Sequence, residues 1–70
     1  MILVVNAGSS SIKVEVFDRA LTSVLIGAVS EIGGAAHLKL GDARHAVQAP
    51  DHRAALNHLL EGLAVRDIPL

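Results

Sequence analysis

The stretch Asn6-Ala7-Gly8-Ser9-Ser10-Ser11 lies between an apolar segment, residues 2–5, and a strand-like segment, residues 12–17. The first of these segments is an unbroken run of aliphatic and mostly β-branched side chains, which favours a buried strand over a helix. Small residues between two such segments are typical of a chain reversal, and Gly8 can adopt the positive φ that many reversals need. The sequence therefore predicts a β-hairpin whose bend is this stretch.

The bend carries groups that suit a phosphate. Where bulky side chains are absent, successive backbone amides can point into a shared concavity that binds an anion. The serines add hydroxyl donors, Lys13 adds a compact and mobile positive charge, and Asn6 adds an amide oxygen that can contact Mg²⁺ directly or through a water. The candidate site residues are Asn6 for the metal and Gly8, Ser9, Ser10, Ser11 and Lys13 for the phosphates.

An ordinary turn is the alternative interpretation of the same residues. Small polar residues dominate turns, and serines often hydrogen-bond their own backbone. The stretch is also not a Walker A motif, because the pattern G-x-x-x-x-G-K-[ST] is absent and the bend leads into a strand rather than a helix. The pattern alone therefore leaves open that the serines only shape the turn.

The segment Leu3-Val4-Val5-Asn6-Ala7-Gly8-Ser9-Ser10-Ser11-Ile12-Lys13 closely resembles the amino-terminal signature of the acetate kinases and of their acetokinase relatives, the propionate and butyrate kinases. That family belongs to the actin-like ATPase superfamily, whose distant members, such as the sugar kinases, usually carry Asp in place of Asn6. An asparagine followed by a triple serine therefore indicates the acetokinase branch. The resemblance is dense as far as Asp18 and looser beyond it.

The resemblance implies an activity: reversible, Mg²⁺-dependent phosphoryl transfer between ATP and acetate, giving acetyl phosphate and ADP, with Mn²⁺ as the other candidate metal. It also implies that Asn6 acts at the metal and phosphate end of the site, that Lys13 is the family's ATP-binding lysine, and that the serines line the phosphate loop. The family's catalytic arginines and acidic residue have no counterpart in this sequence. We therefore assign no catalytic residue and expect these residues alone to be inactive.

The length sets a limit on the architecture. A chain of 70 residues buries only about 60% of its unfolded surface, which allows one domain at most. We expect an α/β fold, a β-meander with added strands and one helix, which opens an actin-like ATPase (ribonuclease H-like) domain. Residues 1–70 would be the amino-terminal part of that domain, with the rest of the enzyme absent from this chain and residues 65–70 leading from the helix toward a further element.

The alternation of aliphatic residues and the positions of turn residues predict the remaining strands. In residues 12–17 every second residue is aliphatic, which predicts one core-facing side. A turn at residues 18–20 leads to a third strand over residues 22–29, in which Gly27 indicates a bulge or a close neighbour. Residues 36–40 and 43–48 form a predicted hairpin.

The turn of this hairpin consists of Gly41 and Asp42, and glycine at the first position suits a type II′ bend. Two-residue closure sets Lys39 opposite Arg44, a like-charge pair. We interpret these two residues as solvated and splayed, with a basic patch for an anion as the alternative.

A helix is predicted to begin after Pro50, with Asp51 as its N-cap. Four leucines then follow at positions 56, 59, 60 and 63, one stripe that faces a core. Gly62 lies within that stripe and weakens the helix, which indicates close packing or an early end.

Composition excludes several functions. The net charge is −1 and Phe17 is the single aromatic residue, so we expect no nucleic-acid partner. No apolar run approaches the ~20 residues of a membrane span, and the start lacks the basic region of a signal peptide. Cysteine is absent, which excludes a disulfide framework and fits a cytoplasmic protein. The expected partners are ATP, acetate, the remainder of the enzyme and a second copy in a homodimer, as in the family.

Two other functions stay open. One is a different kinase of the actin-like superfamily, acting on propionate, butyrate or a sugar. The other is a non-catalytic β-rich interaction module in which the serines only form a turn. The four histidines lack the spacing of metal ligands and are interpreted as ordinary surface or half-buried residues.

Overall fold

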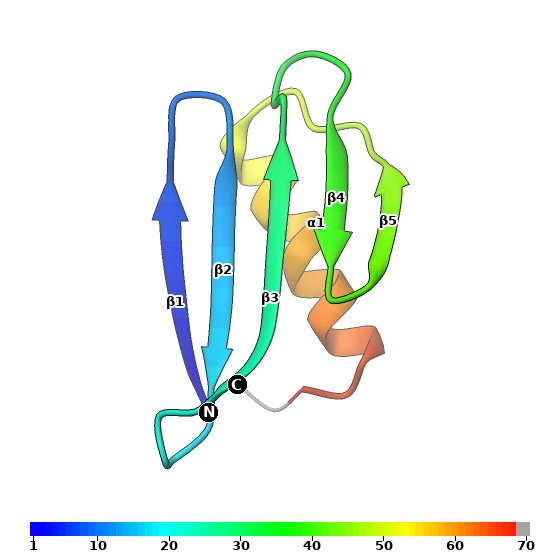
Figure 1. The fold of residues 1–70 in the computed structure, drawn as a ribbon. Helices are drawn as coiled ribbons and strands as arrows, with labels where there is room; N and C mark the ends of the chain where they lie inside the picture. Colours follow the sequence, from blue (N-terminus) through cyan, green and yellow to red (C-terminus); the bar gives the residue numbers. More distant parts are fainter. Residues whose placement is uncertain (69–70) are drawn as a thin grey trace.

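A computed structural model describes residues 1–68, which form five strands and one helix (Figure 1). The elements are β1 (Ile2–Ala7), β2 (Ile12–Phe17), β3 (Ser23–Ser30), β4 (His37–Leu40), β5 (Ala43–Ala46) and α1 (His52–Val65). The strands form one antiparallel sheet in which their spatial order is their order along the chain. The expected α/β composition is thus confirmed, and the meander extends to all the strands.

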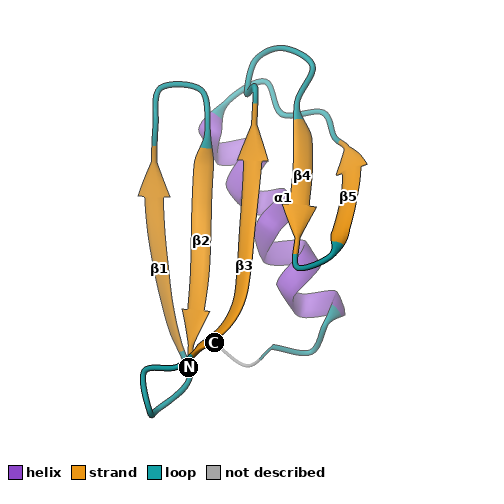
Figure 2. Cartoon of the chain, in the orientation of Figure 1, coloured by secondary structure: helices purple, strands orange, loops and turns teal. Residues whose placement is uncertain are grey.

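The described part of the molecule has two layers, the sheet and α1 (Figure 2). The helix packs across β2, β3 and β4, and the core lies between the two layers. Its buried residues are aliphatic throughout: Ile12, Val14, Val16, Val29, Ala36, Leu38, Leu40, Ala49, Ala55, Leu59 and Leu63. The predicted alternation in β2 is confirmed, because its first, third and fifth residues are the buried ones.

The first strand differs from the prediction. Residues 2–5 do form a strand, but Ile2, Val4 and Val5 are between 41% and 50% exposed, so this strand is not buried. The reason is topological: β1 lies at the edge of the sheet and pairs with β2 alone, while α1 lies over the middle strands. An aliphatic run predicts a strand, but it does not tell a central strand from an edge strand.

Gly27 is buried in β3 because the helix layer approaches the sheet at this point. A Cβ atom at this position would lie 2.6 Å from Leu40 Cδ1 and 3.0 Å from Leu59 Cδ2. The strand register continues through Gly27 without interruption. Of the two predicted explanations for this glycine, the close neighbour is therefore correct.

Gly62 has a similar role on the helix side. A Cβ atom here would lie 2.6 Å from Leu40 Cδ2, so Gly62 marks close packing rather than an early helix end. The helix continues to Val65. The end of the predicted exit segment, residues 69–70, lies outside the described residues.

The helix begins as predicted. Asp51 has extended backbone, and its Oδ1 accepts a hydrogen bond of 2.8 Å from the N–H of Ala54, which satisfies one of the first-turn donors. Leu59 and Leu63 are buried together with Ala55, whereas the other two leucines of the predicted stripe are half-buried at its border. The buried stripe of α1 therefore runs along Ala55, Leu59 and Leu63, with Leu56 and Leu60 at its edge.

The β4–β5 hairpin has the predicted register, with Leu40 opposite Ala43 and Lys39 opposite Arg44. Gly41 has φ +58, while Asp42 is not among the residues with positive φ. These signs are those of a type II′ turn, as expected for glycine at the first turn position.

Replacing Arg44 with glutamate should stabilise the protein by about 0.5 kcal/mol, because an opposite-charge pair across two strands replaces a like-charge pair. The measurement is the free energy of unfolding in urea. Arg19→Glu, in the exposed β2–β3 turn, makes the same change in net charge and should have a smaller effect. An equal gain from both variants would mean that net charge, rather than the cross-strand pair, is responsible.

Candidate functional site

The connection between β1 and β2 is formed by residues 8–11, which we call the serine loop. It lies at the same end of the sheet as the start of α1 (Figure 1). The loop is closed by a hydrogen bond of 2.8 Å from the N–H of Gly8 to the carbonyl oxygen of Ser11. The Gly8 amide is therefore used within the loop, and what this residue contributes is the shape of the bend.

Glycine suits this position for a different reason from the one expected. Gly8 does not adopt a positive φ. Instead, a Cβ atom there would lie 2.8 Å from the hydroxyl oxygen of Ser11, closer than Cβ atoms approach other groups. The absence of a side chain makes room for this hydroxyl.

The serine amides are arranged differently. Within residues 1–68, the backbone N–H groups of Ser9, Ser10 and Ser11 donate to no protein acceptor, and all three residues are exposed. Exposed and unused amides on successive residues of a tight bend are the donors that an anion site uses. The bend thus presents backbone donors and hydroxyl groups together at one end of the sheet.

The carbonyl groups of the serine loop are held by other parts of the fold. Nε2 of His52, in the first turn of α1, lies 2.7 Å from the carbonyl oxygen of Gly8. The N–H of Ile32, in the β3–β4 connection, donates to the carbonyl oxygen of Ser10 at 2.9 Å. Two segments far away in the sequence therefore fix the loop.

Sequence reasoning missed both contacts, and it treated His52 as an ordinary histidine. The two partners in the His52 bond are 44 residues apart. Neither residue belongs to a motif that connects it with the bend, so the sequence held no signal for this contact.

Asn6 and Lys13 are brought together by the β1–β2 ladder, in which they are directly opposite each other. Residues opposite each other in a ladder share one face, and for this pair it is the face away from α1, because Ile12 and Val14 point toward the helix. Both side chains are exposed. No carboxylate of residues 1–68 lies within ion-pair distance of Lys13. An amide oxygen and an ammonium group therefore lie side by side next to the serine loop.

The same row continues across the sheet. Lys13 is opposite Ala28, Ala28 is opposite Lys39, and Lys39 is opposite Arg44. Ala28, which has a small side chain, separates Lys13 from Lys39 in this row. This row of the uncovered face therefore carries Lys13 next to the serine loop and two further basic side chains, while Glu15 lies on the same face of β2 two residues beyond Lys13.

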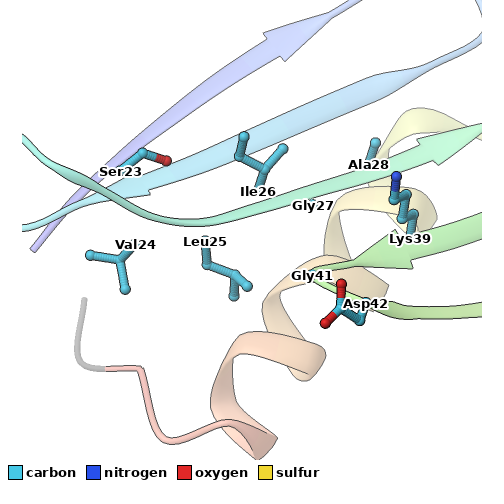
Figure 3. A pocket seen from close by; sticks show the side chains of 9 residues that line it. All are labelled: Ser23, Val24, Leu25, Ile26, Gly27, Ala28, Lys39, Gly41 and Asp42. Atoms are coloured by element: carbon cyan, nitrogen blue, oxygen red, sulfur yellow. The ribbon is translucent and has the colours of Figure 1, made fainter.

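A hollow on the uncovered face over β3 is a separate feature (Figure 3). Val24 and Ile26 give it apolar walls, and Lys39 and Asp42 lie at its border. None of the predicted site residues lines it.

Two further observations concern metals and membranes. In the part of the chain that the structure describes, no group of three or more His, Cys, Asp or Glu residues is gathered as a metal site would require. Among residues 1–68, α1 is too short and too polar to cross a membrane.

The chain is similar to a known family of proteins over nearly its whole length. A family model matches residues 1–69, and it places the chain in a lineage of kinases, enzymes that transfer phosphoryl groups. That model is described as the acetokinase family, and because the match covers nearly the whole chain, the chain belongs to this family. The resemblance inferred from the serine-rich bend is thus confirmed. Comparison with curated proteins gives no match.

Proposed function

We propose that residues 1–70 are the amino-terminal part of an acetate kinase, which transfers a phosphoryl group reversibly between ATP and acetate to give acetyl phosphate and ADP. The observation that carries this proposal is the set of unused serine amides beside the Asn6–Lys13 pair. Membership of the acetokinase family supports it. The sheet and helix would be the opening part of an actin-like ATPase domain, with the remaining catalytic groups and the acetate site supplied by the rest of the enzyme.

Catalysis of phosphoryl transfer consists mainly of positioning and of charge neutralisation. In this chain, the amides and hydroxyls of Ser9, Ser10 and Ser11 would hydrogen-bond phosphate oxygens of the nucleotide. The ammonium group of Lys13 would offset the negative charge that these oxygens carry. Gly8 would contribute by leaving room for the Ser11 hydroxyl.

The donor set also fits a hard divalent cation. The side-chain oxygen of Asn6 is an exposed amide oxygen opposite Lys13, and Mg²⁺ prefers oxygen ligands and retains several waters. Asn6 would hold Mg²⁺, or Mn²⁺, directly or through such a water. When bound, the metal would neutralise charge on the phosphate oxygens.

The proposal is tested by titrating MgATP into the full-length protein while following the amide signals of residues 8–13. We expect the largest shifts at Ser9, Ser10 and Ser11 and smaller ones at Gly8, whose N–H is already engaged. A coupled assay with ADP and acetyl phosphate then measures ATP formation. Shifts spread evenly over the surface, or no shifts, would favour an interaction module without a nucleotide site, and transfer to propionate, butyrate or a sugar instead would indicate another kinase.

Replacing Asn6 with alanine should raise the Mg²⁺ concentration for half-maximal activity by about tenfold, since groups that hold or orient a metal typically contribute this much to its affinity. The measurement is activity against Mg²⁺ concentration at fixed ATP. Asn57→Ala, on the exposed face of α1, is the control and should leave the Mg²⁺ dependence unchanged. An unaltered dependence in Asn6→Ala would remove this residue from the metal site.

A further inference from the structure

We infer that His52 is a positioning residue, which orients the amides of the serine loop toward a bound phosphate without touching the phosphate itself. The inference rests on the proposed function, because it assigns a purpose to the loop amides. Its basis is the contact of 2.7 Å between His52 Nε2 and the carbonyl oxygen of Gly8. A ring nitrogen at this distance from a carbonyl oxygen must carry a proton and donate it.

Because of the geometry of the peptide group, this contact also fixes the direction of the Ser9 N–H. A trans peptide is planar, and its C=O and N–H bonds point in opposite directions. The carbonyl of Gly8 and the N–H of Ser9 belong to one such peptide, and no described peptide is cis. By holding the carbonyl toward α1, His52 directs the N–H of Ser9 away from the helix.

Ile32 does the same two peptides further along the loop. Its N–H donates to the carbonyl oxygen of Ser10 at 2.9 Å, which directs the N–H of Ser11 away from the β3–β4 connection. Two alternate carbonyls of a short loop are thus held from behind, and the amides of Ser9 and Ser11 are left free for a ligand. Of the two anchors, only His52 acts through a side chain, so it is the one that substitution can remove.

The anchor is itself well supported. His52 is half-buried at the first position of α1, directly after the N-cap Asp51. The segment before the helix is tied to the β3–β4 connection by a hydrogen bond of 2.8 Å from the N–H of Gly33 to the carbonyl oxygen of Ala49, which is buried. The buried residues of α1 pack on the sheet, so the position of His52 is fixed by the core. Through His52, the serine loop is attached to this fixed helix.

The test compares four variants of the full-length protein. His52→Ala removes the donor. His52→Gln keeps an amide N–H near the position of Nε2, and His52→Asn places one a methylene shorter. His58→Ala is the matched control, because His58 lies on the same helix and makes the same kind of bond, 2.8 Å from Nε2 to the carbonyl oxygen of Gln48, away from the loop.

We expect His52→Ala and His52→Asn to weaken MgATP binding about tenfold, since small misplacements of positioning groups have effects of this order. His52→Gln should bind within about twofold of wild type for the same reason, and His58→Ala should bind as wild type does. In the free proteins, the amide signals of Ser9 and Ser11 should move in His52→Ala and in His52→Asn but not in His58→Ala. If His52→Ala does not fold, the comparison of His52→Asn with His52→Gln decides.

Wild-type affinity in both His52→Ala and His52→Asn, with unmoved loop signals, would overturn the inference and leave the proposed function intact. Equal losses in His58→Ala would also overturn it, because they would indicate a general effect of altering the helix. Failure of the wild-type protein to bind MgATP would contradict the proposed function and, with it, the purpose assigned to His52.

Discussion

Replacing Lys13 with alanine in the full-length protein should lower kcat about 100-fold, because removal of one group that stabilises developing charge has an effect of this size. The free energy of unfolding should change by less than about 0.5 kcal/mol, since Lys13 is an exposed residue outside the core. Its ammonium group lies on the uncovered face, opposite Asn6 and with no carboxylate of residues 1–68 in ion-pair range. Loss of activity without loss of stability is what separates a binding residue from a structural one.

The sheet offers a matched control for this variant. Lys39 lies in the same cross-strand row and on the same face, with Ala28 between it and Lys13, and it is also exposed. Lys39→Ala makes the same change in charge two strands away from the serine loop and should leave kcat within about twofold of wild type, as expected for a surface substitution away from the site. Equal losses in both variants would show that the general potential of the face matters, and unchanged kinetics in Lys13→Ala would remove Lys13 from the site.

The sequence predicted those features of the fold that depend on neighbouring residues. The β1–β2 hairpin, the alternation in β2, the turn at Gly41 and the N-cap Asp51 all follow from patterns a few residues long, and all are present. The prediction that β1 is buried was wrong, because the burial of a strand depends on how many neighbouring strands it has in the sheet. That number is set by the topology of the whole sheet, which no short segment contains.

The candidate site divides in the same way. Asn6, the serine loop and Lys13 belong to one recognisable motif, so the sequence could predict them as site residues. The β1–β2 ladder then places Asn6 opposite Lys13. The anchors of the loop come from the β3–β4 connection and from α1. The space that Gly8 leaves is likewise taken by the Ser11 hydroxyl, and the backbone angle at Gly8 is not the positive φ that was expected. The sequence could not predict these contacts, because they join groups that only the folded chain brings together.

Replacing Gly27 with alanine should destabilise the protein by about 2 kcal/mol, the usual cost of adding a methyl group to a filled core. The new Cβ atom would lie 2.6 Å from Leu40 Cδ1, 3.0 Å from Leu59 Cδ2 and 3.3 Å from Val14 Cγ2. These neighbours belong to β4, α1 and β2 and are all buried. The contacting atoms are side-chain ends, but each belongs to a buried residue, so moving them aside would require other core side chains to repack. The measurement is the free energy of unfolding of the full-length protein in urea.

A second glycine shows whether the cost arises from crowding. Gly34, in the β3–β4 connection, has no positive φ, and the nearest atom to its added Cβ would be the carbonyl oxygen of Glu31 at 3.7 Å, an ordinary contact. Gly34→Ala should therefore leave stability unchanged or raise it by up to about 1 kcal/mol, because alanine lowers the conformational entropy of the unfolded chain.

A double variant tests which contact is responsible. In Gly27→Ala with Leu40→Val, the shorter side chain at position 40 removes the closest contact of the new Cβ atom. The two losses should then be less than additive, because the substituted residues touch. Additive losses would mean that the contact with Leu40 is not what makes Gly27→Ala costly, and crowding by this side chain would then not be what constrains position 27.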